Sequence, residues 1–152
     1  MKAVVQRVTR ACVTIKETGT RREIGAGMVT LLAVAQGDTA EGAAWLAEKL
    51  VGLRVFEDTD GKMNLSLRET GGAMLVVSQF TLLGDARRGR RPSFALSAPP
   101  DIARPLYETF VRAVVAQGIG VQTGEFGADM SVEIVNDGPV TLVVETPALS
   151  GS

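Results

Sequence analysis

Apolar residues in this sequence either alternate with polar ones or form short unbroken runs, a pattern typical of β-strands. Most of these stretches are rich in valine, isoleucine and threonine. Two of them, at residues 28–34 and 73–77, are continuously apolar, which predicts strands covered on both faces. The pattern as a whole predicts strands at residues 3–9, 12–16, 28–34, 54–56, 73–77, 130–134 and 140–145. Arg21, Arg22 and Glu23 fall between two runs and are predicted to form a polar link.

Two stretches have helical spacing instead. From residue 39 to 53, apolar side chains recur every three or four positions, at Ala43, Leu46, Ala47, Leu50 and Leu53. Asp38 or Thr39 can cap this helix. The second predicted helix follows a long loop at residues 84–100, and Pro105 is expected in or before its first turn. Its expected apolar stripe is Ile102, Leu106, Phe110 and Ala113, with Tyr107, Val111 and Val114 beside it.

The order of these elements predicts a single α/β domain over residues 1–146. Two helices cannot cover both faces of so many strands, so we expect a sheet packed on a sheet, with both helices on one outer face. Residues 147–152 are small and polar, and we expect them to be a disordered tail.

Composition narrows the possible functions. The 152 residues are 45% hydrophobic, enough for a core, and the formal net charge of −1 confines any RNA contact to a local patch. The single cysteine, Cys12, cannot form an internal disulfide and fits a strand interior. No apolar run reaches the length of a membrane span and the start lacks an apolar signal segment, so we expect a cytoplasmic protein.

The sequence contains no histidine. Its absence excludes the Ser-His-Asp and Cys-His arrangements, a histidine general base and the usual zinc sites. No carboxylate cluster has the spacing of a calcium-binding loop. We therefore predict neither a metal nor a cofactor.

The first candidate for chemistry is Ser78-Gln79-Phe80-Thr81-Leu82, which leaves a predicted buried strand. A structural interpretation is a strand end whose hydroxyls satisfy backbone groups. A functional interpretation is a set of donors, from the backbone and the Gln79 amide, for a carbonyl oxygen that becomes an oxyanion. Ser78 or Thr81 as a nucleophile would need a base, and none stands nearby.

Two further segments have a structural and a functional interpretation. Asn136-Asp137-Gly138-Pro139-Val140-Thr141 is typical of a hairpin turn between two strands. Its functional interpretation is a cis Gly-Pro bond, which only about 5–6% of X–Pro bonds in folded proteins adopt. Arg87, Arg88, Arg90 and Arg91 form a charge run that is either a solvated loop or a grip for phosphates.

Taken together, these segments resemble the bacterial D-aminoacyl-tRNA deacylase family, also called D-tyrosyl-tRNA deacylases. The resemblance extends from Met1 to about Thr146. The segments that carry it, in family order, are Gln6-Arg7-Val8-Thr9-Arg10-Ala11, Gly61-Lys62-Met63-Asn64-Leu65, Ser78-Gln79-Phe80-Thr81-Leu82, Arg91-Pro92-Ser93-Phe94, Gly127-Ala128-Asp129-Met130 and Asn136-Asp137-Gly138-Pro139-Val140-Thr141.

This resemblance implies a homodimer with a layered α/β/β fold and active sites at the subunit interface. The pocket would hold the 3′-terminal adenosine of an aminoacyl-tRNA, without a cofactor, a membrane or DNA. The residues it implies are Ser78, Gln79, Phe80 and Thr81 as the catalytic wall, Gly138 and Pro139 as a cis element inserted from the other subunit, Arg7 as the residue that orients this element, and Phe94 and Met130 as further substrate-binding positions.

The implied activity is hydrolysis of D-aminoacyl-tRNA and of mischarged glycyl-tRNA. The backbone at Gly138 and Pro139 would leave no volume for an L side chain, whereas a D side chain or glycine would fit. Catalysis would rest on positioning, oxyanion donors and the neighbouring ribose 2′-hydroxyl. Thr81 as an acyl-accepting nucleophile is the rival mechanism.

Three alternatives stay open at the level of sequence. Editing domains of some threonyl-tRNA synthetases resemble the same fold but remove an L-amino acid. A nucleic-acid-binding dimer without catalysis would use residues 87–91 and show salt-dependent binding with no turnover. A purely structural dimer would leave the Ser78 segment unexplained.

Overall fold

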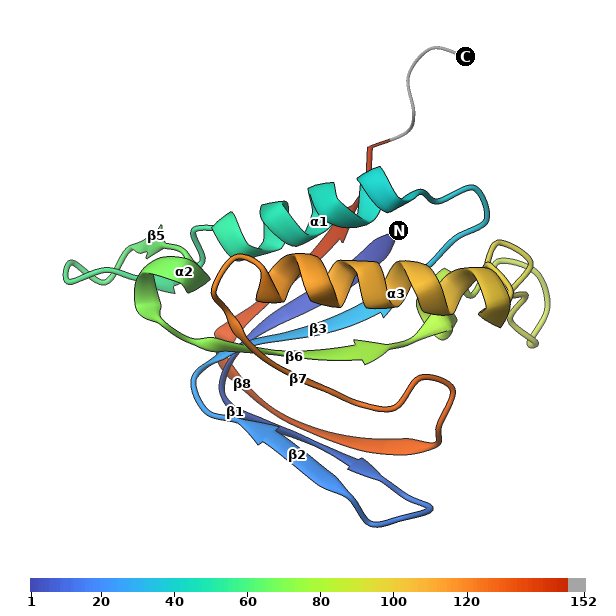
Figure 1. The fold of residues 1–152 in the computed structure, drawn as a ribbon, viewed down its shortest axis with the longest axis horizontal. Coiled ribbons are helices and arrows are strands. Elements are labelled where there is room, and N and C mark those ends of the chain that lie inside the picture. The colour runs from blue at the N-terminus through green and yellow to red at the C-terminus, as the bar shows by residue number, and fades with distance from the viewer. Residues whose placement is uncertain (148–152) are drawn as a thin grey trace.

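The computed structural model describes residues 1–147, and the long strands within them form one mixed sheet (Figure 1). The strand order is β2-β1-β3-β6-β7, and β8 also pairs with β1. The strands of this sheet are β1 (Lys2–Ile15), β2 (Arg21–Ile24), β3 (Gly27–Ala33), β6 (Ala73–Ser78), β7 (Gly120–Thr123) and β8 (Met130–Glu145). Most of the tail predicted to be disordered, residues 148–152, lies outside the described residues.

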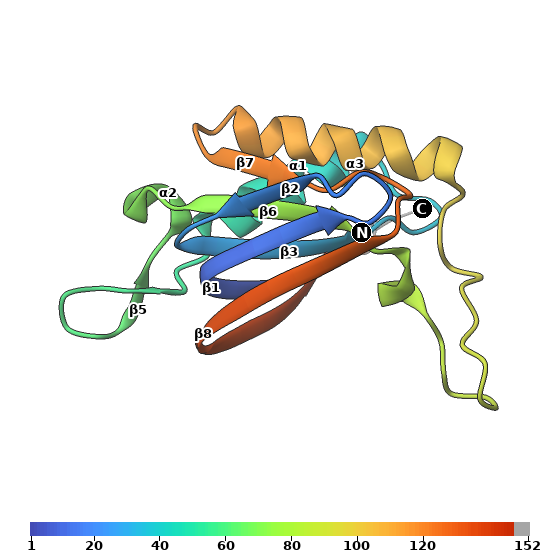
Figure 2. The same cartoon turned by 90° about the horizontal axis from the view of Figure 1, so that it is seen from below.

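Two crossover connections place the long helices. β3 pairs in parallel with β6, and β6 with β7, whereas β1 is antiparallel to β2, β3 and β8. Parallel neighbours need a crossover, and the two crossovers carry α1 (Ala40–Gly52) and α3 (Pro100–Val115). Both helices lie side by side on one face of the sheet, as expected (Figures 1 and 2). None of the helices within residues 1–147 combines the length and apolar character that crossing a membrane requires.

The short elements complete the fold. β4 (Phe56–Glu57) and β5 (Met63–Leu65) form a separate ribbon around the predicted turn at residues 58–61, where the Asp58 carboxylate accepts the Asp60 and Lys62 N–H groups. These hydrogen bonds hold the pKa of Asp58 below its ordinary value, the bond from Lys62 contributing most. The other short elements are α2 (Leu67–Thr70) and the 3-10 turn η1 (Phe80–Leu83).

Apolar side chains are buried on both faces of the sheet. One cluster lies between the sheet and the two helices and includes Leu46, Leu50 and Phe110. The second lies on the opposite face, where side chains of β1, β2, β3 and β6 pack with the half-buried Val132 and Ile134 of β8. Strands of the same sheet therefore supply both sides of this second cluster. Hydrogen bonds join the long strands of residues 1–147 in this one curled, nearly barrel-shaped sheet, whereas the sequence pattern predicts two sheets.

Two predictions about β1 and β2 were wrong. The predicted strands at 3–9 and 12–16 are one strand, because register shifts between Gln6 and Arg10 accommodate the exposed Thr9 and Arg10 without ending it. The charged residues predicted as a link form β2. An edge strand tolerates them: Arg21 and Glu23 point to solvent, and Arg22 is half-buried.

The predicted α1 is confirmed, with Thr39 as its cap: the Thr39 hydroxyl accepts the Gly42 N–H at 3.1 Å. In α3 the prediction was wrong by about one residue. The buried positions are Ala103, Tyr107, Phe110 and Val114, whereas Ile102 is 49% exposed. Pro105 lies inside this helix, beyond its first turn. The proline is exposed, so the carbonyl it leaves unpaired one turn earlier can bind water.

Candidate functional site

The chain turns out of the sheet at the end of β6. Ser78 is the last residue of the strand, and the Gln79 N–H still donates to the Leu32 carbonyl at 2.8 Å. The next residues form η1, so the segment predicted to leave a buried strand does so. The first N–H groups of a helical turn have no partner inside it, and no acceptor among residues 1–147 receives those of Phe80 or Thr81. The segment thus carries free backbone donors.

Side chains of this segment contact each other. The Gln79 amide donates to the Thr81 hydroxyl oxygen at 3.1 Å. An amide cannot take the proton of that hydroxyl, so this contact orients Thr81 without activating it. The Phe80 ring is 56% exposed.

Segment 78–81 forms one wall of a pocket of about 660 Å³. Residues at the start of α3, including Ala103, and the loop from Phe126 to Met130 form the other walls. The predicted site residue Met130 therefore lies in the pocket with Ser78, Gln79, Phe80 and Thr81. Of the side chains that line it, only Asp129 is ionisable; it is exposed and forms an ion pair with Lys16 at 3.4 Å. The walls are otherwise apolar or uncharged.

Phe94 is not among the lining residues but lies behind the wall. Its ring meets the Phe80 ring edge to face, with centroids 5.1 Å apart. Gly84 makes room for it, because a Cβ at Gly84 would stand 2.9 Å from the Phe94 Cε1 atom. Phe94 therefore supports the position of Phe80.

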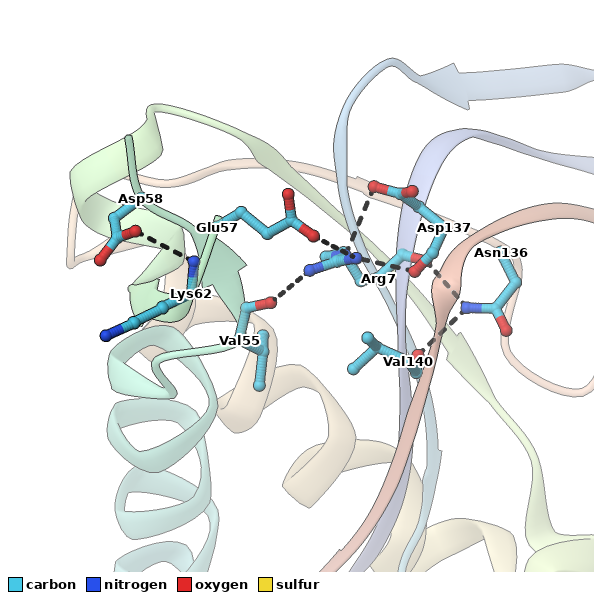
Figure 3. Close-up of polar contacts among 8 residues, drawn as sticks. All are labelled: Arg7, Val55, Glu57, Asp58, Lys62, Asn136, Asp137 and Val140. Atoms are coloured by element: carbon cyan, nitrogen blue, oxygen red, sulfur yellow. Dashed lines mark hydrogen bonds and ion pairs between the residues drawn. The ribbon is translucent and has the colours of Figure 1, made fainter. Parts of the chain in front are cut away.

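Arg7 anchors the second group of predicted residues (Figure 3). Its side chain is almost fully buried, Nη1 donates to the Val55 carbonyl at 2.8 Å, and Nε donates to the Asp137 carbonyl at 3.2 Å. The Asp137 carboxylate also lies 3.3 Å from Nε, and the Asn136 amide donates to the carbonyls of Arg7 and Val140. These bonds fix the backbone on both sides of the Gly138–Pro139 bond, at Asp137 and at Val140.

The Gly138–Pro139 bond is cis, and Gly138 has a φ of +121°. A Cβ there would stand 2.9 Å from both Arg7 Nη2 and Val140 Cγ2, so no other residue fits without a shift. The structure corrects the hairpin interpretation. Asn136 lies opposite Val8 and Thr141 opposite Gln6, so residues 137–140 bulge out of one continuous strand pair.

The pocket segment 78–81 and the segment around Gly138 and Pro139 lie at opposite ends of the sheet. On β3, Ser78 pairs with Leu32 and Arg7 with Met28, four positions apart, which is ~13 Å along the strand. Neither Gly138 nor Pro139 lines the pocket. In Figure 2 the bend of β8 lies at one end of the sheet and the turn after β6 at the other. Within one chain, the Gly138–Pro139 segment does not reach the pocket.

The arginine loop, Arg87 to Arg91, projects from a narrow base. Asp85 and Ser93 exchange backbone hydrogen bonds of 2.8 and 2.9 Å. The Arg87 guanidinium donates to the Asp85 carboxylate, which lowers the pKa of that carboxyl. Arg88, Arg90 and Arg91 are exposed, and none forms an ion pair with another described residue. The loop thus presents three free cations.

Reasoning from the sequence missed several parts of the site. Ser97 and Phe126 line the pocket, and the Ser97 hydroxyl donates to the Phe80 carbonyl at 3.4 Å. The only local signal for Phe126 was its place between Gly124 and Gly127, which marks a loop. Within residues 1–147, no group of three or more cysteine, aspartate or glutamate side chains is arranged to hold a metal ion.

Known proteins are similar to this chain over almost its whole length. The family model described as D-Tyr-tRNA(Tyr) deacylase matches residues 4–145. Proteins described as D-aminoacyl-tRNA deacylases from Geobacter sulfurreducens and Desulfatibacillum aliphaticivorans are 54% and 57% identical, covering 100% and 96% of this chain and 99% of each relative.

Solved structures are similar over almost the whole chain. One, described as a c-Myc DNA Unwinding Element Binding Protein, is 40% identical with a TM-score of 0.89 and covers 97% of this chain and 100% of its own. Another, described as a probable eukaryotic D-amino acid tRNA deacylase, is 19% identical with a TM-score of 0.82, over 95% of this chain and 98% of its own, and supports the fold alone.

Proposed function

Because the chain belongs to the D-Tyr-tRNA(Tyr) deacylase family, we propose that it hydrolyses the ester between a D-amino acid and the 3′-terminal adenosine of tRNA. Mischarged glycyl-tRNA is a second substrate. The observation that carries this proposal is the pocket at segment 78–81, which offers free backbone donors in largely uncharged walls. Such a site suits a substrate that is already an activated ester and needs positioning more than acid–base chemistry.

The pocket offers an apolar face for the adenosine and backbone N–H donors for the ester. A pocket of about 660 Å³ has the size of small-molecule sites, and the exposed Phe80 ring offers the terminal adenosine an apolar face. The ester carbonyl lies against segment 78–81, where the N–H groups of Phe80 and Thr81 stabilise the developing oxyanion. One such donor contributes about 3–4 kcal/mol to the transition state.

Water attacks the ester, and the ribose 2′-hydroxyl assists it. No side chain of the pocket is placed to serve as a nucleophile activated by a base: the Thr81 hydroxyl meets only the Gln79 amide, and the sequence has no histidine. The protein's contribution is therefore geometry and charge stabilisation.

The active unit is a homodimer in which the Gly138–Pro139 segment of one subunit enters the pocket of the other. The α/β/β layers of each subunit consist of the two helices and the two sides of one curled sheet. The separation of the two groups within one chain supports this arrangement. β8 supports it too: this edge strand exposes Val135, Leu142 and Val143, and such a stretch needs a cover.

Handedness is selected by exclusion. Gly138 and Pro139 present backbone atoms that Arg7 and Asn136 hold in place, close to the α-carbon of the bound amino acid. These atoms leave no volume for an L side chain, whereas a D side chain points away and glycine has none. Many D-amino acids pass, because no contact recognises a particular side chain.

The direct test compares purified protein on D-tyrosyl-, L-tyrosyl- and glycyl-tRNA in single-turnover assays. We expect hydrolysis of the D-ester and the glycyl ester at rates at least about a hundredfold above that of the L-ester, the size of a steric rejection of about 3 kcal/mol. Equal rates on the D- and L-esters would refute chiral selection, and preference for the L-ester would instead match a synthetase editing domain.

A second candidate function is DNA binding without catalysis. The relative described as a DNA unwinding element binding protein and the three free cations of the arginine loop favour it. This candidate predicts salt-dependent binding of duplex or single-stranded DNA and no ester hydrolysis, so the same assay separates the two.

A further inference from the structure

A second cavity, of about 570 Å³, lies beside the loop that follows β7. The β1–β2 turn, β2, α3 and residues 123–126 line it. Three arginines from two elements face it, Arg22 on β2 and Arg104 and Arg112 on α3. We call this cavity the arginine cleft.

The positive charge of the arginine cleft is only partly neutralised. Arg104 forms an ion pair with Glu108 at 3.1 Å, and Glu125 also lines the cavity. Arg22 and Arg112, in contrast, form no ion pair with any residue of 1–147. Guanidinium groups without a carboxylate partner are the groups that bind phosphates well.

Arg22 is fixed before any ligand arrives. Its Nη1 atom donates to the carbonyls of Thr123 and Gly124, at 2.8 and 3.4 Å. Carbonyl acceptors orient the guanidinium but leave its charge intact, and the half-buried side chain loses little freedom on binding. Arg112 is oriented in a similar way, since its Nη2 donates to the Thr109 hydroxyl at 3.1 Å.

The arginine cleft adjoins the pocket of the proposed active site. Phe126 lines both cavities, and on α3 Ala103 faces the pocket while Arg104 faces the cleft. The dividing wall is anchored: the Phe126 ring packs on Tyr107 with centroids 5.7 Å apart, and the Tyr107 hydroxyl donates to the Val76 carbonyl of β6. A chain that leaves the pocket over this wall enters the cleft directly.

We propose that the arginine cleft binds backbone phosphates of the tRNA acceptor strand, in the nucleotides that precede the terminal adenosine. This inference rests on the proposed function, because it takes the adenosine to lie in the pocket. The cleft supplies charge for affinity and register, and it reads no base.

The test uses the double variant Arg104→Gln/Arg112→Gln in the full-length protein. Both positions are exposed on α3, and Arg22 is left intact because it also holds the loop after β7.

Two quantities are measured: the Kd for uncharged tRNA, and the ratio of kcat/KM on D-tyrosyl-tRNA to that on the D-tyrosyl ester of adenosine. We expect the Kd to rise about tenfold and the ratio to fall by a similar factor through KM. The log–log slope of binding against salt should weaken by roughly 0.7 for each phosphate that the protein no longer neutralises.

Arg21→Gln is the control, since it removes one arginine from the opposite face of β2, where Arg21 pairs with Glu23 and Glu133. It should leave the Kd and the ratio unchanged. An unchanged Kd in the double variant, or an equal loss in the control, would overturn the proposal. Failure of the wild type to hydrolyse either ester would instead count against the proposed function, while the Kd for uncharged tRNA would still decide whether the cleft binds RNA.

Discussion

At the scale of single residues, Thr81 distinguishes two chemistries. Its hydroxyl lies in the pocket wall, 3.1 Å from the Gln79 amide and without a base. We predict that Thr81→Ala lowers the single-turnover rate on D-aminoacyl-tRNA by less than about tenfold, the effect of poorer positioning. A loss of ~10⁴-fold with substrate binding intact would identify Thr81 as an acyl-accepting nucleophile.

Gly138 tests the role of the anchored backbone. In Gly138→Ala the new methyl group would meet Arg7 Nη2 and Val140 Cγ2 at 2.9 Å, in a backbone conformation with φ of +121°. We expect a fall of about a hundredfold or more in kcat/KM on D-aminoacyl-tRNA, because a displacement of about 1 Å at a reacting centre can cost that much.

Gly118→Ala is the matched control for Gly138→Ala. Gly118 also has a positive φ, +84°, but a Cβ there would meet nothing within 4 Å. It should therefore reproduce the backbone penalty without displacing any neighbour. A similar loss of activity in both variants would show that Gly138 acts only through stability.

Tyr107 gives a test that depends on pH. Burial raises its pKa to about 12, above the ordinary 10.0, so the protonated hydroxyl is favoured in the folded state. Its contribution to stability is complete below pH 10 and is lost as pH rises through about 12. As the only tyrosine, it can be followed by tyrosinate absorbance over the pH range in which circular dichroism shows native protein. Ionisation of the native protein with a midpoint near that ordinary value would contradict this burial.

At the scale of elements, the sequence predicted what local pattern determines. The run at residues 73–77 ends in polar residues, so both β6 and the turn after it were predictable. β2 was not, because its charged residues suit an edge strand and a loop equally well. The apolar face of α3 was misplaced because Ile102 continues the helical period on the exposed side, whereas Leu106 of the same predicted stripe is half-buried against the core.

The site followed the same division. Segment 78–81 is local and was singled out from its residues, whereas the cis bond before Pro139 was implied only by the family resemblance, its residues having predicted a hairpin turn. The wall at Phe126 depends on how a distant loop meets β6. The distance between Arg7 and Ser78 is likewise set by tertiary structure, because it depends on where β1 and β6 pair along β3. Neither has a signature in the residues themselves.

The arginine loop can be tested as an element. Its base adjoins the pocket through the contact of Phe94 with Phe80, and the proposed function therefore implies that a tRNA bound at the pocket passes near its free cations. We predict that Arg88→Gln/Arg90→Gln raises KM for D-aminoacyl-tRNA about tenfold and leaves kcat close to that of the wild type, because phosphate contacts position the substrate.

Arg68→Gln, which removes an exposed arginine of α2, is the control for the loop variant and should leave KM unchanged. If the loop variant binds tRNA with the same affinity and salt dependence as the wild type, the loop is only a solvated segment.

At the scale of the whole molecule, the two groups of residues that we propose to form one site do not meet within a chain. The pocket adjoins the end of β6, and the Gly138–Pro139 segment lies about four strand positions away along β3. Figure 2 shows the turn after β6 and the bend of β8 at opposite ends of the sheet. The exposed apolar residues of β8 give a second copy a surface to cover. A two-fold dimer would place each segment in the other subunit's pocket and complete two equivalent sites.

Subunit complementation tests this claim most directly. Ala128→Trp fills the pocket of its own chain, and Gly138→Ala disables the segment lent to the partner. Each variant alone should be inactive on D-aminoacyl-tRNA. After mixing at equal amounts and subunit exchange, about half of the dimers are mixed and each carries one intact site, so about a quarter of the wild-type activity should return. No recovery of activity in a mixture shown to contain mixed dimers would contradict a site shared between subunits.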